Sequence, residues 1–265
     1  MGHVADHLFV QGIDLEVVRR GAGRPMLLLH GPHPVTATAP FLELLGRHAE
    51  VIAPSHPGFG SSPRPDDFDT VYDLVHFYLD VLEHLGHETV TLMGFGFGGW
   101  LAAEIAVVCP HRLDRLILVD AVGIKLSAPD TPDILDLFNT SPAEVQRRSW
   151  HDPATWQPDF DAMSDEALVR YARDRDALCL YAWHPYMYNP QLKRWLSRIV
   201  VPTLMLWGES DRIVTPAYGR AYSALIPGAR FEVIAAAGHH PEIEQPAAFV
   251  ERVVAFLEAP CRPGT

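Results

Sequence analysis

The sequence has few cysteines and no concentrated positive charge, and both features exclude some classes of function. Its 265 residues include three cysteines, Cys109, Cys179 and Cys261, which form no metal-binding or redox spacing. Three cysteines are too few for a disulfide framework, and an odd number cannot all pair. This favours a reducing cytoplasm. The 33 acidic residues outnumber the 21 basic ones, giving a formal charge of −12 without any lysine or arginine block. We therefore expect no nucleic-acid partner.

Long apolar runs are also missing. No segment reaches the ~18 consecutive apolar residues that a membrane span needs. The N-terminal stretch "MGHVADHLFV" has no basic region followed by a long apolar core. The sequence thus predicts a cytoplasmic protein with a small-molecule substrate, no membrane partner, no cofactor and no metal, and it leaves a homo-oligomer open. At 48% hydrophobic residues, the chain can bury one large core.

Short apolar runs and helical patterns alternate along the chain. Residues 7–21 predict two antiparallel edge strands turned about Gly12, because the second part alternates apolar and polar residues. Nearly continuous apolar runs predict strands that are buried on both faces. We therefore predict an α/β fold with a doubly wound, mostly parallel sheet of about eight strands. The buried strands are expected near 24–31, 51–54, 89–94, 113–120, 201–208 and 229–236, with helices between them and a final helix near 246–259.

The alternation stops between about Ala121 and Arg198. We predict that residues 1–123 and 199–265 form the core and that residues 124–198 form an inserted cap. Aromatic residues are dense in this insertion, and they either attach the cap to the body or line a pocket beneath it. Trp183 and Tyr186 are the members that we expect to bind substrate. The full set is Trp150, Trp156, Tyr171, Tyr181, Trp183, Tyr186, Tyr188 and Trp195.

The stretch "MGFGFGGW" at 93–100 has two interpretations. Gly94, Gly96 and Gly99 spell GxGxxG between a strand and a helix, and Asp120 follows after the next strand, as in a dinucleotide-binding site. That motif normally follows the first strand of its unit, however, whereas several strands precede it here. The alternative is a nucleophile elbow, GxSxG, in which Gly94 and Gly98 are the small flanking residues and Gly96 replaces the serine. Position in the chain favours the elbow.

The later motifs support this second interpretation. An acid and then a histidine should follow an elbow, and Asp211 and His239 each follow a later apolar strand. In this order of motifs the chain resembles the α/β-hydrolase superfamily along almost its whole length. It looks most like small esterases, lactonases and carbon–carbon bond hydrolases. The matching pieces are "LLLHG" at 27–31, "HPGFGSS" at 56–62, "MGFGFGGW" at 93–100, "WGESDRIV" at 207–214 and "GHHPEIEQP" at 238–246.

The resemblance assigns roles by position. Asp211 would orient His239, and His239 would be the general base. His240 is expected to be structural or to lie on the pocket rim. Asp120 is the alternative acid, because some members of the superfamily take theirs from the preceding strand. The resemblance also implies that the insertion is the cap of the superfamily.

Two departures bear on the chemistry. Gly96 has no side chain to act as the nucleophile, and losing the serine of such a site typically lowers turnover by a factor of ~10⁶. Gly96 is either the natural residue or a replacement of a serine. Phe97 can still supply one oxyanion amide, but the residue after the HG turn is Pro32, which has no N–H. His33 is expected to substitute through its amide or its ring.

Four hypotheses follow. The first is a hydrolase for a small apolar or aromatic ester, lactone or carbon–carbon substrate, impaired at Gly96 or serine-independent. The second is a lyase or isomerase that uses His239 and Asp211 as its base. The third is a non-catalytic ligand-binding relative, and the last is a dinucleotide-dependent enzyme.

Overall fold

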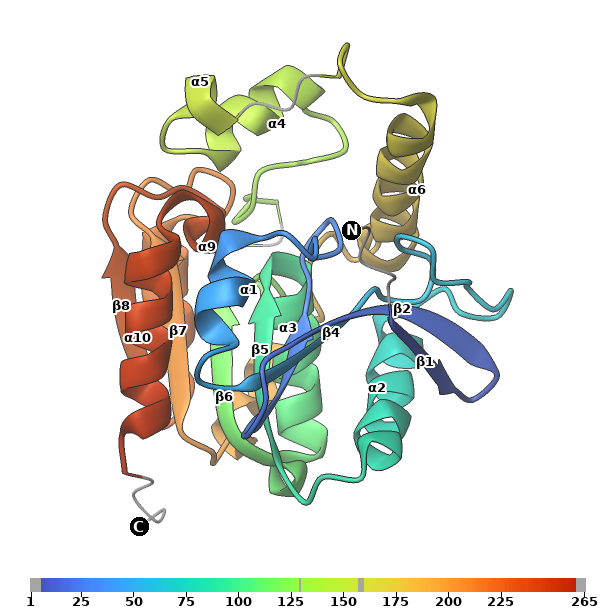
Figure 1. Cartoon of the computed structure of the whole chain (residues 1–265). Helices are drawn as coiled ribbons and strands as arrows, with labels where there is room; N and C mark the ends of the chain where they lie inside the picture. The colour runs from blue at the N-terminus through green and yellow to red at the C-terminus, as the bar shows by residue number, and fades with distance from the viewer. Residues whose placement is uncertain (1–5, 129, 157–159, 261–265) are drawn as a thin grey trace.

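A single sheet runs through the centre of the molecule (Figure 1). The computed structural model describes residues 6–128, 130–156 and 160–260, so Cys261 lies outside it. The order of the eight strands is β1-β2-β4-β3-β5-β6-β7-β8, with the pairs β1–β2 and β2–β4 antiparallel and the others parallel. The strands are β1 (Asp6–Val10), β2 (Ile13–Arg20), β3 (Pro25–Leu29), β4 (Glu50–Pro54), β5 (Val90–Phe95), β6 (Leu113–Val119), β7 (Thr203–Gly208) and β8 (Arg230–Ile234).

Burial explains why the strands have these sequences. Every residue of β5 and β7 is buried, because helices cover both faces of a parallel sheet. In β2 buried residues instead alternate with less buried ones over the first half of the strand, as expected at an antiparallel edge. The predicted doubly wound sheet and its antiparallel edge are therefore confirmed.

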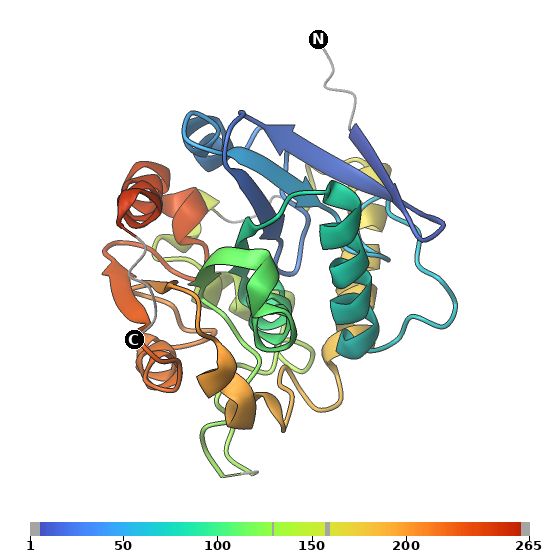
Figure 2. The same ribbon diagram turned by 90° about the horizontal axis from the view of Figure 1, so that it is seen from below.

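Helices pack on both faces of the sheet, as the view from below shows (Figure 2). Residues of α1 and α10 belong to one hydrophobic core, and residues of α2, α3 and α8 belong to the other. The α2 helix begins with a capping box between Thr70 and Asp73 and ends at Gly86, whose backbone is left-handed. The helices are α1 (Pro40–Leu45), α2 (Val71–Leu85), α3 (Gly96–Val108), α8 (Pro216–Ser223), α9 (Pro241–Glu244) and α10 (Pro246–Glu258).

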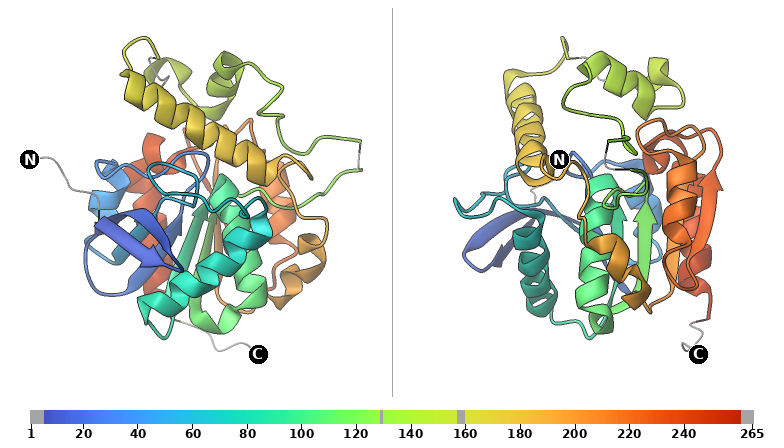
Figure 3. Two further views of the ribbon diagram at one scale, coloured as in Figure 1. Left: turned by 90° about the vertical axis from the view of Figure 1, so that its right-hand side faces the viewer. Right: turned by 180° about the vertical axis from the view of Figure 1, so that it is seen from behind.

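The chain between β6 and β7 leaves the sheet and crosses over its carboxyl edge (Figure 3). Asp174 of α6 accepts a hydrogen bond from the Gly60 amide at 2.8 Å, and the Tyr181 hydroxyl donates to the Pro57 carbonyl at 3.1 Å. Tyr181 thus attaches the insertion to the body. The bounds 124 and 198 of the cap stay a prediction. The helices of the insertion are α4 (Pro142–Ser149), α5 (Pro153–Trp156), α6 (Asp165–Ala182) and α7 (Leu192–Trp195).

The helices do not have the character of membrane spans. Within the part of the chain that the structure describes, none is both long enough and apolar enough to cross a bilayer.

Candidate active site

The turn between β5 and α3 is tight enough to require glycine at two positions. A methyl group at Gly94 would lie 2.2 Å from the Gly98 carbonyl oxygen, and one at Gly98 would lie 2.2 Å from the Leu29 carbonyl oxygen. Between them, Gly96 has φ +48, the left-handed conformation that an elbow residue adopts. The glycines therefore serve close backbone packing around one turn, which favours the elbow over a phosphate-binding loop.

Asp211 and His239 meet at the carboxyl ends of β7 and β8. The Asp211 Oδ2 atom is 2.8 Å from Nδ1 of His239, with side-chain exposures of 0% and 9%. The other carboxylate oxygen of Asp211 accepts hydrogen bonds from the amides of Ile213 and Val214 at 2.8 and 3.0 Å. The His239 amide donates to the Ser149 carbonyl at 2.6 Å, so the cap also positions this loop. Asp211 therefore holds the histidine ring, and Ser149 holds the backbone that carries it.

The other ring nitrogen of His239 faces Gly96. A methyl group built on Gly96 would lie 3.4 Å from Nε2, an ordinary van der Waals contact. Burial opposes protonation of the ring, but the charge and hydrogen bond of Asp211 outweigh it and raise the pKa of His239 above 6.5. The imidazole therefore points at the place where the elbow residue of a serine hydrolase carries its nucleophile.

Asp120 lies beside this pair but does not bond to the histidine. It has a left-handed backbone, φ +44, is 1% exposed, and accepts a hydrogen bond from the Gly208 amide at 3.0 Å. Burial, and next the charge of Asp211, raise the pKa of Asp120 well above its ordinary value, which favours the neutral acid. The geometry thus favours Asp211 over Asp120 as the partner of His239.

These three residues are also the one candidate metal-binding group among the residues described in the structure. One ligand atom from each of Asp120, Asp211 and His239 lies within 4.8 Å of the others. The 2.8 Å hydrogen bond between Asp211 and His239 already uses two of these atoms. A cation placed between them would have to break this bond. We therefore interpret the group as a proton-transfer site.

The predicted oxyanion donors come from two places, the elbow at Phe97 and the turn at Pro32 and His33. Phe97 lies in the first turn of α3, where backbone amides have no acceptor within the helix. Pro32 and His33 both line the cavity. The His33 ring, however, lies 3.2 Å from Asp174 Oδ2 and stacks on Tyr171 of the cap, so the ring is engaged there. The backbone amide of His33 remains the candidate second donor.

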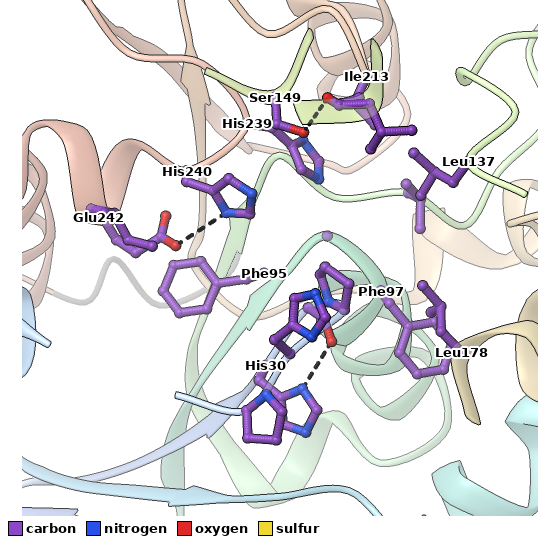
Figure 4. Close-up of a pocket in the computed structure, with 18 of the residues that line it drawn as sticks. His30, Phe95, Phe97, Leu137, Ser149, Leu178, Ile213, His239, His240 and Glu242 are labelled. Carbon is purple, nitrogen blue, oxygen red and sulfur yellow. Dashed lines mark hydrogen bonds and ion pairs between the residues drawn. The ribbon is translucent and has the colours of Figure 1, made fainter. Parts of the chain in front are cut away.

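A cavity of about 380 Å³ opens above these residues (Figure 4). Its lining is mostly apolar and joins the sheet loops to the cap. Trp183 and Tyr186 are not part of it, in contrast to our prediction. Trp183 is 55% exposed, and the Tyr186 hydroxyl is bonded to the Leu135 carbonyl. The lining includes Pro32, His33, Phe95, Phe97, Leu137, Trp150, Arg175, Leu178, Ile213, His239, His240 and Glu242.

The cavity contains charged residues that the sequence did not single out. Arg175 comes from α6, and Glu242 from α9 beside His240. Glu242 stands within the "GHHPEIEQP" motif, two residues after His240, which was the available signal. No comparable signal marks Arg175, because charged residues occur throughout α6.

Two buried histidines stack on each other beside the cavity, and one of them, His30, is part of its lining. The rings of His30 and His56 are 3.7 Å apart, and the His56 Nδ1 atom lies 2.5 Å from the Tyr78 hydroxyl. The His56 amide donates to Nε2 of His30 at 2.9 Å. Burial lowers the pKa of His56 to about 4 and that of His30 well below 6.5. Both rings are therefore neutral and hold the HG turn in place.

The fold, the elbow and the Asp211–His239 pair together define an α/β hydrolase. The chain belongs to the alpha/beta hydrolase family, whose model matches residues 26–252. The predicted family and its enzyme class, hydrolase, are confirmed. The functional roles of the individual residues stay predictions.

Two known hydrolases and one solved structure are similar to this chain over almost its whole length. The chain is 31% identical to the 2-hydroxy-6-oxo-2,4-heptadienoate hydrolase of Pseudomonas putida, over 94% of each protein. It is 29% identical to the 2-hydroxymuconate semialdehyde hydrolase of a Pseudomonas species, over 96% of this chain and 94% of that one. The fold is similar to that of the 2-hydroxy-6-oxo-6-phenylhexa-2,4-dienoate hydrolase of a Rhodococcus species. That structure has a TM-score of 0.76 and 21% identity over 97% of this chain and all of the other.

Proposed function

We propose that this protein hydrolyses a carbon–carbon bond beside a ketone in a small carboxylate, with water in place of a serine nucleophile. The observation that carries the proposal is the direction of His239, whose Nε2 atom faces Gly96 at 3.4 Å from a methyl group built there. The names of the relatives, which are hydrolases of oxo-dienoates and a semialdehyde, support the class of substrate.

The cavity suits a molecule with one charged end. Its walls are mostly apolar, and Arg175 brings a guanidinium group to the lining from the cap. One nitrogen of this group donates to the Leu137 carbonyl at 3.2 Å, which leaves its other donors for a ligand. A guanidinium pairs well with a carboxylate. We infer that Arg175 binds the carboxylate of the substrate while its apolar part lies toward Phe97 and Ile213.

The reaction follows from the placement of His239. The imidazole accepts a proton from water, and the resulting hydroxide adds to the ketone carbon. The Phe97 amide stabilises the oxyanion, which then expels the neighbouring carbon together with the bonding electron pair. That carbon takes up a proton, so one water is consumed and a carboxylic acid and a shortened carbon chain are released.

The test uses 2-hydroxy-6-oxo-6-phenylhexa-2,4-dienoate and follows its loss by absorbance. The unchanged protein is compared with Gly96→Ser and His239→Ala. We expect slow turnover by the unchanged protein, a gain of at least about 10³ in kcat for Gly96→Ser, and none for His239→Ala. Turnover by Gly96→Ser alone would overturn the role of water. Inactivity of both the unchanged protein and a folded Gly96→Ser would overturn the proposed function.

A further inference from the structure

A second imidazole–carboxylate pair faces the same cavity. The Nδ1 atom of His240 lies 3.6 Å from Oε1 of Glu242, and both residues line the cavity beside His239 (Figure 4). Their side chains are 21% and 9% exposed. His240 is therefore the more accessible member of the pair, and its carboxylate partner is the more buried one.

The two histidine rings are adjacent but independently held. Their centroids are 5.3 Å apart and their planes are inclined by 74°. The ring of His240 also packs on Trp150 at 4.5 Å. Each ring turns Nδ1 toward its own carboxylate, and neither Nε2 has a hydrogen-bonding partner among the residues described. One substrate can thus contact two separate imidazole nitrogens.

Glu242 places its carboxylate beside the His240 ring. Its second oxygen, Oε2, is buried and has no hydrogen-bonding partner in the described part of the chain. The other oxygen, Oε1, faces Nδ1 of His240 in the pair that the structure records for Glu242, so the carboxylate fixes which way the ring points. His240 is therefore oriented to exchange a proton with a bound substrate through Nε2, whereas His239 faces the water-activating position at Gly96.

We propose that His240 is the general acid that protonates the leaving group and that Glu242 is its positioning residue. The inference rests on the proposed function for its substrate, and it divides between two histidines the proton transfers that a single histidine performs in a serine triad. As the carbon–carbon bond breaks, its electron pair stays on the leaving carbon. That carbon forms a bond to the proton of His240 Nε2, and His240 recovers a proton from solvent.

Leaving groups of different basicity test this assignment. A carbanion or a phenolate needs a proton in the transition state, whereas a p-nitrophenolate ion leaves without one. The assays are run in the Gly96→Ser background and measure hydrolysis of the phenylhexadienoate, phenyl pentanoate and p-nitrophenyl pentanoate. We expect His240→Gln to lower kcat for the first two by about 10² and to leave p-nitrophenyl hydrolysis within about threefold.

Two further variants separate a chemical role from a structural one. Glu242→Gln keeps the shape but removes the charge, so it should lower phenyl ester turnover by about tenfold. It should lower kcat and leave KM nearly unchanged, because the ring loses the group that orients it while the cavity keeps its shape. His76→Gln on the exposed face of α2 is the matched control and should change none of the three rates.

The outcomes distinguish this inference from the proposed function. Equal losses on phenyl and p-nitrophenyl esters would show a structural role and overturn the assignment of His240, as would no loss at all. If the dienoate is not hydrolysed but the phenyl ester still depends selectively on His240, the proposed function fails and the general acid stands.

Discussion

His239 and Asp211 are joined by a 2.8 Å hydrogen bond although they lie 28 residues apart on two different loops. The loops follow neighbouring parallel strands, β7 and β8, whose carboxyl ends lie at the same edge of the sheet. The pair is therefore assembled by the topology of the sheet rather than by nearness in sequence.

The pH dependence of catalysis should report this pair. His239 must be neutral to act as a base, so kcat/KM should rise with pH and level off above its raised pKa, with a midpoint above 6.5. The charged ring also stabilises the fold below pH 6.5, and that contribution is lost as pH rises through the raised pKa. An NMR titration of the His239 ring gives the pKa directly.

Asp211→Asn provides the matching test. The change removes the charge that raises the pKa of His239, so the midpoint should move to lower pH and kcat should fall by about 10³. The control is Asp14→Asn, which alters the exposed His7–Asp14 pair far from the cavity. An unchanged His239 titration in Asp211→Asn would contradict the assignment of Asp211 as its partner.

Acid should destabilise the protein through the buried histidines His30 and His56. The pKa of His56 is about 4 in the folded chain and 6.5 in a free one, so the fold favours the neutral ring. Its contribution is complete above pH 6.5 and is lost as pH falls toward 4, by about 3 kcal/mol in total. Urea unfolding at several pH values measures it.

Asn at position 56 cannot be protonated in this range. His56→Asn should therefore flatten the pH dependence of the unfolding free energy only in part, because His30 still titrates. The variant should also be less stable at every pH. His76→Gln should retain the full dependence. An equal slope in all three proteins would argue against the buried histidines as its source.

The elbow should not tolerate a side chain at Gly98. A methyl group there would approach the Leu29 carbonyl oxygen to 2.2 Å, so the backbone of β3 would have to move. We expect Gly98→Ala to lower the unfolding free energy by more than about 3 kcal/mol. Gly12→Ala is the control, because nothing lies within 4 Å of its added methyl group and only its φ of +80 is unfavourable, at about 1–2 kcal/mol. Thermal unfolding of both variants decides the point.

The attachment of the cap should depend on Asp174. This buried carboxylate accepts the Gly60 amide and faces His33, so Asp174→Ala leaves the amide without its acceptor. We expect a loss of about 1–3 kcal/mol and faster proteolysis within the cap. Asp174→Asn keeps an acceptor and should lose less. Asp176→Ala, at an exposed position of the same helix, should resemble the unchanged protein. Equal proteolysis of all variants would contradict the role of Asp174.

Much of this architecture was predictable from local pattern. The buried strands have continuous apolar sequences, and the order of the elbow, Asp211 and His239 along the chain identifies a site whose members meet in space. The positions of Trp183 and Tyr186 were not predictable. A high density of aromatic residues predicts that many of their rings pack against other residues. It does not predict which of these rings line the cavity. Glu242 and Arg175 were missed because a charged residue in a helix has the same pattern whether it faces solvent or a cavity.

The contact between Gly98 and Leu29 has a consequence for protein engineering. Gly94 and Gly98 are fixed by backbone atoms, whereas a methyl group added at position 96 makes only ordinary contacts and meets only the strain of a φ of +48. A saturation library at that codon would exchange the reacting group while the surrounding scaffold stays the same. Serine, cysteine and aspartate there would each present a different nucleophile to the same histidine, so one fold could be screened for several chemistries.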